Sequence, residues 1–200
     1  MGRPREHDEH TRAALLEAAE QIVADGGPAA LSVRAVADAA GTTTRAVYTL
    51  FGSKDGLLVE ALARDAFEFL HTEIGRLQET DDPASDLLDV GFVVRRLVRE
   101  HPALYRIAFQ RIVPGLEAGP ELAATRQRAW EQLVARVERL RPESLRADKP
   151  AAEAAVEFIA MSDGLGSAEL RGAVLRLLPE GSEEQAWRNA LTTVIRGWAP

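Results

Sequence analysis

The sequence predicts an all-α fold in which an N-terminal three-helix head is joined by one long helix to a larger helical domain. Apolar residues recur at helical spacing along most of the chain, whereas the alternation typical of strands is hard to find. Gly26-Gly27-Pro28, Gly41 and Pro83 fall between periodic segments, where helices are expected to end. With 200 residues and 46% hydrophobic content, the chain is long enough for one small and one larger domain.

Local signals define four helices in the first part of the chain. An apolar stripe stops at the Gly-Gly-Pro sequence of residues 26–28, which is typical of a helix end. Ser32 and Thr43 are expected to cap the next two helices, with Gly41 at the turn between them. Ser53 is expected to cap a fourth helix, a rod of about 37 Å. The first helix is expected to end at residue 26. The other three are expected to span residues 33–40, 44–50 and 54–78.

The rest of the chain is also predicted to be helical. The linker 141–150 is polar and is expected to be exposed, and the glycines at 164 and 166 indicate a kink or a helix end. Prolines 102 and 120 stand where first-turn prolines belong. The expected helices span residues 85–100, 102–112, 120–140, 151–168 and 182–198.

Composition excludes several classes of protein. No stretch approaches the roughly 18 apolar residues of a membrane span, and the first ten residues are polar, so we expect a cytoplasmic protein without membrane contact. The absence of cysteine excludes a disulfide framework, a thiolate nucleophile and a cysteine-based metal site. His7 and His10 lack a third ligand, so neither a metal nor a cofactor is expected. No catalytic triad or carboxylate pair can be argued from spacing.

The positions of Ser32, Gly41, Thr43 and Ser53 are typical of a helix-turn-helix, with two short helices joined by a tight glycine turn and followed by a capped helix. The third helix exposes side chains that can hydrogen-bond phosphates or base edges in a major groove. These side chains are Thr44, Arg45, Tyr48 and Thr49.

The net charge of the whole chain opposes DNA binding, whereas the charge of the helix-turn-helix segment favours it. The net charge is −7, and residues 1–60 hold six Lys or Arg against nine Asp or Glu, a net charge of −3. Between residues 41 and 54, however, Arg45 and Lys54 are the only charged side chains. Lys54 in the first turn of a helix opposes the helix dipole unless a phosphate binds there. Arg3 and Arg5 could enter a minor groove or belong to a solvated tail.

One region resembles the N-terminal signature of the TetR family, the tetracycline-repressor type of transcriptional regulator. The resemblance covers about residues 9–69 and is carried by Thr11-Arg12, Leu15-Leu16, Ala18-Ala19, Gly26, Leu31-Ser32-Val33-Arg34, Val36-Ala37, Ala40-Gly41, Thr43, Ala46-Val47-Tyr48, Phe51, Ser53-Lys54-Asp55 and Leu57. Leu50 departs from the pattern, because the family often has His or Tyr there.

The resemblance implies a repressor that a small-molecule effector releases from double-stranded DNA. It divides the chain into a flexible arm (1–8), a DNA-binding domain (9–69, with the helix-turn-helix at 32–51) and an effector-binding and dimerisation domain (70–200). It also implies that Arg34 and Lys54 contact phosphates. The residues implied to face the operator are Thr43, Thr44, Arg45, Tyr48 and Thr49, with Thr42 nearby in the turn.

Effector binding is a hypothesis with a competing structural interpretation. Apolar and aromatic residues of the C-terminal part could line a pocket or could simply pack in the core. They are Phe92, Tyr105, Phe109, Trp130, Phe158 and Met161. Arg96 belongs to the cluster Arg95, Arg96, Arg99, Arg106 and Arg111, which with Glu100 carries a net charge of +4. This cluster could bind an anionic effector. It could instead be a solvated face whose charges balance acidic residues elsewhere in the chain.

Two late helices predict a homodimer. Residues 151–161 are apolar around most of the helix, which implies a second buried face. Together with the last helix they could form a four-helix interface with a twofold copy. The expected interface residues are Val156, Ile159, Ala160, Trp187, Leu191, Val194 and Ile195. A twofold dimer implies a pseudo-palindromic operator. The alternatives left open are a helical enzyme or ligand carrier that keeps the head as a scaffold, and a module that binds another protein.

Overall fold

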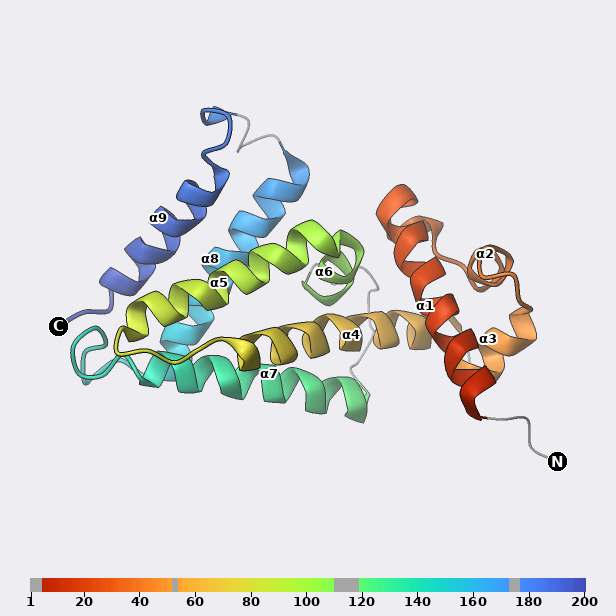
Figure 1. The fold of residues 1–200 in the computed structure, drawn as a ribbon, viewed down its shortest axis with the longest axis horizontal. Helices are drawn as coiled ribbons and strands as arrows, with labels where there is room; N and C mark the ends of the chain where they lie inside the picture. Colours follow the sequence, from red (N-terminus) through yellow and green to blue (C-terminus); the bar gives the residue numbers. More distant parts are fainter. Residues whose placement is uncertain (1–4, 52–53, 110–118, 173–176) are drawn as a thin grey trace. The chain divides into compact units, whose positions relative to one another are not determined.

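In the computed structural model, the described residues are 5–51, 54–109, 119–172 and 177–200, and at residues 5–7, 28 and 54–59 only the backbone is described. These residues form helices and turns, as expected for an all-α chain (Figure 1). Contacts divide the chain into two compact units, Met1–Ala66 with His101–Ala124 and Phe67–Glu100 with Thr125–Pro200. The break falls near the predicted boundary at 69/70, but residues 101–124 join the first unit. Within the described residues, no helix is both long and apolar enough to cross a membrane.

The first unit contains the predicted head. Helix α1 (Arg5–Gly26) packs against α2 (Val33–Ala39), α3 (Thr44–Phe51) and α6 (Pro102–Phe109), and a short 3-10 turn η1 (Pro28–Ala30) follows α1. The buried side chains are apolar and come from all of these helices, which is what an amphipathic helix cluster requires. They include Leu15, Ala19, Val23, Val36, Ala37, Val47, Phe51, Ala103 and Tyr105.

The predicted flexible arm at 1–8 is wrong from Arg5 onward, because α1 begins there. The sequence Arg5–His10 contains no glycine or proline that would stop a helix, so α1 extends upstream of the apolar stripe. Residues 1–4, including Arg3, lie outside the described residues.

The second unit is built on three helices that pack against one another, α5 (Pro83–Glu100), α8 (Ala151–Arg171) and α9 (Glu183–Arg196). Gly91 permits the close approach of α5 to α9, because a Cβ at this position would collide with Leu191 and lie 3.3 Å from Phe158. The unit also contains the later parts of α4 (Lys54–Arg76) and α7 (Pro120–Glu138).

Two expectations about the second unit need correction. The linker 141–150 is exposed only in part, since Leu145 and Lys149 are buried and Arg141 donates to the carbonyls of Arg146 and Lys149 at 2.9 and 2.7 Å. Gly164 and Gly166 do not end a helix, because α8 continues to Arg171 and ends at Gly172 in the left-handed conformation.

Candidate nucleic-acid interface

The turn between α2 and α3 is held by the capping groups that the sequence predicts. The Ser32 hydroxyl accepts a hydrogen bond from the Ala35 amide at 3.1 Å, and the Thr43 hydroxyl accepts one from the Ala46 amide at 3.2 Å. Gly41 adopts a φ of 63°, which glycine reaches at little cost. The Thr42 amide then donates to the Ala37 carbonyl at 2.9 Å, and α3 leaves the turn in a defined direction.

One side of α3 is exposed. Thr43, Thr44, Arg45, Tyr48 and Thr49 are all solvent-accessible, and the 47% exposure of Tyr48 is high for an aromatic residue. Thr42 is half-buried in the turn.

The opposite side of α3 anchors it to the head. Val47 and Phe51 are buried, and Ala46 and Leu50 are half-buried. The Arg12 guanidinium of α1 lies over the Phe51 ring, 5.4 Å from its centroid, at the distance of a cation–π contact. The threonines of α3 therefore face solvent while its apolar residues pack against the rest of the head, which includes α1 and α2.

The expected phosphate contacts are described only in part. Arg34 is exposed on α2, where its Nε lies 3.8 Å from the Asp38 carboxylate, an exposed pair that holds the side chain weakly. Lys54 is the first residue of α4 and Arg5 the first residue of α1, but the structure describes only their backbone. Arg3 lies outside the described residues.

The expected effector residues are not brought together. Phe92 and Arg96 line one cavity of 380 Å³ on α5, together with Arg95, Arg99 and Glu100. Met161 lines a different hollow, and Phe158 is fully buried in the core. Tyr105 and Phe109 stack on each other at 5.3 Å in the first unit, and Trp130 is half-buried on α7.

The arginines of α5 form internal ion pairs. Arg95 is 9% exposed and donates through Nε and Nη2 to the two carboxylate oxygens of Glu169, each at 3.1 Å. Trp187 Nε1 donates to the same carboxylate at 2.7 Å. Arg96 pairs with Glu73. The expectation that these arginines are solvated is thus wrong for Arg95. The expectation that they pair with acidic residues elsewhere in the chain is confirmed for Arg95 and Arg96. Arg111 lies outside the described residues.

The predicted dimer residues separate into two groups. Trp187, Leu191 and Ile195 are buried within the single chain, so they cannot offer surface to a second subunit. Val156 is 57% exposed, Ala160 is exposed, and Ile159 and Val194 are half-buried. A mostly apolar hollow of 560 Å³ lies between α8 and α9 and is lined by Glu157, Ala160, Met161, Thr193, Val194, Gly197 and Trp198.

Sequence reasoning missed a buried carboxylate at the start of α5. Asp86 is 2% exposed and accepts from Arg139 Nη1 at 2.6 Å and from the Thr80 hydroxyl and amide at 2.7 and 2.9 Å. Burial by itself would raise the pKa of Asp86, but the hydrogen bonds from Arg139 and Thr80 outweigh it and hold the pKa below its ordinary value. Its partner lies 53 residues away, so no local pattern could reveal it.

A helix-turn-helix head that exposes hydroxyls, a phenol and a guanidinium on its second helix defines a DNA-binding protein of the regulator class. Comparisons with known proteins agree. Residues 15–61 match the sequence model of the family described as bacterial regulatory proteins, tetR family. Residues 87–194 match that of the tetracyclin repressor-like C-terminal domain.

Individual proteins are similar to this chain in sequence or in fold. The HTH-type transcriptional regulator Rv1816 of Mycobacterium tuberculosis is 30% identical over 127 residues, which are 62% of this chain and 54% of the relative, so the chain matches about half of that protein. A protein of unknown function from Rhodococcus sp. RHA1 shares the fold, with a TM-score of 0.77, 21% identity and coverage of 95% and 96% of the two chains. SmeT in complex with triclosan does so with a TM-score of 0.67, 20% identity and coverage of 96% and 92%. The chain belongs to the TetR family of bacterial regulatory proteins. Members of this family are transcriptional regulators and not enzymes.

Proposed function

We propose that this regulator reads double-stranded DNA by inserting α3 into the major groove. The observation that carries the proposal is the exposure of Thr44, Arg45 and Tyr48 on a short helix whose other side is buried. A major groove about 12 Å wide admits one α-helix, and its base edges offer acceptors to a guanidinium and to hydroxyls. Arg34 and Lys54 then contact phosphates, which sets position without reading sequence.

The regulator is proposed to be a repressor that a small molecule releases. The name of the matching C-terminal family refers to a repressor, and SmeT shows that a chain of this fold can bind a small organic molecule. In the second unit, the cavity beside Phe92 and Arg96 is the effector-site candidate, and Arg96 Nε is buried there without a hydrogen-bond partner among the described residues. Release requires that the effector bind the DNA-free conformation more tightly than the DNA-bound one.

A homodimer completes the proposal. The hollow between α8 and α9, with Val156 and Ala160 exposed nearby, offers apolar surface to a second copy of the chain. A twofold pair would place two copies of α3 about 34–36 Å apart, in successive major grooves of a pseudo-palindromic operator. Because bacterial DNA lies in the cytoplasm, a regulator that binds it is proposed to be cytoplasmic.

The test removes the proposed base contacts. Arg45→Ala and Tyr48→Ala are each expected to weaken binding to a selected operator by roughly 1–3 kcal/mol, because each deletes groups that meet base edges. Fluorescence anisotropy at one fixed salt concentration measures the affinities. Arg126→Ala, which alters an exposed arginine of α7, is the control and should bind like the unmodified chain. If both helix variants bind with unchanged affinity, α3 is not at the interface.

A further inference from the structure

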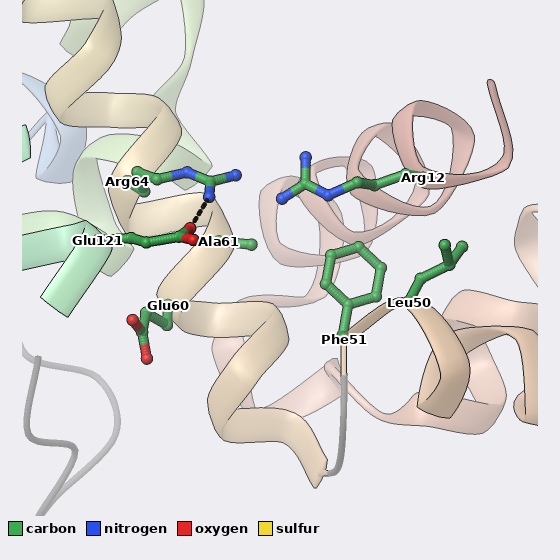
Figure 2. Close-up of a pocket in the computed structure, with 7 residues that line it drawn as sticks. All are labelled: Arg12, Leu50, Phe51, Glu60, Ala61, Arg64 and Glu121. Carbon is green, nitrogen blue, oxygen red and sulfur yellow. Dashed lines mark hydrogen bonds and ion pairs between the residues drawn. The ribbon is translucent and has the colours of Figure 1, made fainter. Parts of the chain in front are cut away.

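A second cavity lies inside the first compact unit, against the end of α3. It has a volume of about 150 Å³ and is lined by Arg12 of α1, Leu50 and Phe51 of α3, Glu60, Ala61 and Arg64 of α4, and Glu121 of α7 (Figure 2). A cavity of about 150 Å³ holds a molecule of the size of benzene.

Two arginines and two glutamates line this cavity, so the lining is neutral as a whole, but its charges are not all paired with one another. Arg64 Nη1 donates to the Glu121 carboxylate at 2.6 Å, so these two charges neutralise each other. The Glu60 carboxylate is directed away from both guanidinium groups (Figure 2) and lies directly against Gly119, where a Cβ would collide with it. Among the described side chains, no carboxylate lies within 4 Å of the Arg12 guanidinium, whose contact is the Phe51 ring. The Arg12 guanidinium therefore lines the cavity without a carboxylate partner among the described side chains.

The guanidinium groups of Arg12 and Arg64 face each other across the cavity. Figure 2 shows Arg12, which lies over the Phe51 ring, and Arg64 on α4 with their guanidinium ends directed toward one another. Two like charges in this arrangement repel, and an anion between them would replace that repulsion with charge-assisted hydrogen bonds. Arg64 retains donors for this purpose, because its Nη2 is 3.8 Å from the nearest carboxylate oxygen of Asp65, beyond hydrogen-bond range.

The remaining lining is apolar. Leu50, Phe51 and Ala61 offer carbon surface, and Phe51 and Ala61 are both 7% exposed. We propose that this cavity binds a small carboxylate with a compact apolar body, its carboxylate held between Arg12 and Arg64 and its body against Phe51 and Leu50. The site is separate from the effector-site candidate on α5, since it belongs to the unit that contains the DNA-binding head.

The location gives this site a direct route to DNA binding. Leu50 and Phe51 form the end of α3, the helix proposed to enter the groove. Any difference in the carboxylate's affinity between DNA-bound and free protein changes DNA affinity by the same factor, because coupling between two binding sites is reciprocal.

Benzoate is a suitable probe because it combines a carboxylate with a ring of the required size. We expect isothermal titration calorimetry of the full chain, at fixed pH and ionic strength, to show benzoate binding at least about tenfold more tightly than benzamide, its neutral counterpart. Equal affinity for the two molecules would overturn the proposal, and so would the absence of any binding heat at roughly 10 mM benzoate.

Variants locate the site. Arg12→Gln should weaken benzoate binding at least about tenfold, Arg12→Lys should keep part of it, and Arg126→Gln should leave it unchanged. If Arg12→Gln does not fold, Leu50→Trp provides an independent test, because the larger side chain fills the cavity and should abolish binding. Arg96→Gln alters the effector-site candidate, and benzoate binding should survive it. Loss of binding in Arg96→Gln with full binding in Arg12→Gln would place the carboxylate on α5 and refute the proposal, without affecting the proposed role of α3 in DNA binding.

Discussion

The threonines at the start of α3 and along it have different roles even though they look alike in the sequence. The Thr43 hydroxyl accepts from the Ala46 amide, and the Thr49 hydroxyl donates to the Arg45 carbonyl at 2.9 Å. Thr44 makes no hydrogen bond with its side chain in the described part of the chain and is exposed. Thr44, Arg45 and Tyr48 are therefore the side chains of α3 with donors available to DNA.

This distinction predicts different outcomes for two similar substitutions. Thr43→Ala removes the cap of α3 and should lower the free energy of unfolding by about 0.5–2 kcal/mol. Thr44→Ala should leave that free energy within about 0.5 kcal/mol of the unmodified value and weaken operator binding. Urea denaturation and anisotropy titration on the same preparations measure both quantities. Equal stability losses in the two variants would contradict the assignment of roles.

At the scale of helices, hydrogen bonds from arginines help to hold the later part of α4 to α7. Arg136 is 7% exposed, and its Nη2 donates to the carbonyls of Ile74 and Leu77 at 3.2 and 2.9 Å, groups that the end of a helix leaves without partners. Arg139 donates to the Thr80 carbonyl and the Asp86 carboxylate, both at 2.6 Å. The segment between α4 and α5 is thus fixed by two arginines near the end of α7.

The Asp86 carboxylate makes part of this stability depend on pH. Its pKa is lowered in the folded chain, so its contribution is present above the unfolded pKa of about 3.9 and is lost as the pH falls through the folded pKa. Asp86→Asn should lower the free energy of unfolding by roughly 1–3 kcal/mol at neutral pH, since hydrogen bonds to a charged group are weakened.

Chemical denaturation of both proteins across a pH series checks this prediction. The difference between them should narrow as the pH falls into the acid range, because the unmodified carboxyl then becomes neutral as well. A difference that stays constant down to acid pH would show that Asp86 acts through packing alone. Asp89→Asn, an exposed carboxylate on the same helix, is the matched control and should have little effect.

The same contacts show how far the sequence could predict this molecule. The caps at Ser32 and Thr43 and the turn at Gly41 were predictable, because each depends on residues within four positions of it. The pairs Asp86–Arg139, Arg95–Glu169 and Arg64–Glu121 join residues 53, 74 and 57 positions apart, and no periodicity carries that information. Aromatic content likewise could not distinguish the buried Phe158 from the half-buried, cavity-lining Phe92.

At the scale of the whole molecule, the central question is whether two chains act together. Predicting Trp187, Leu191 and Ile195 as interface residues failed because an apolar stripe cannot show which surface covers it, and here α5 and α8 do so. The exposed apolar residues on α8 remain the better candidates.

Dimerisation can be tested at Val156. Val156→Asp would bury an unpaired carboxylate in the proposed interface and should weaken self-association at least roughly tenfold, while Val156→Thr, close in shape, should weaken it less. Sedimentation equilibrium measures the association, and operator affinity should fall with it because a single head covers half a site. A Val156→Asp protein that associates like the unmodified chain would exclude this face.

The most direct test of the central claim uses the absence of cysteine from the chain. A single cysteine introduced by Thr49→Cys can carry an iron chelate that cleaves nearby DNA, and Arg126→Cys on α7 provides the control position. The proposed function predicts that the chelate at position 49 cleaves the operator at two clusters about 10–10.5 base pairs apart, one for each copy of α3, whereas the control cleaves weakly or not at all. Equal cleavage from both positions, or none from position 49 on DNA that the protein binds, would contradict it.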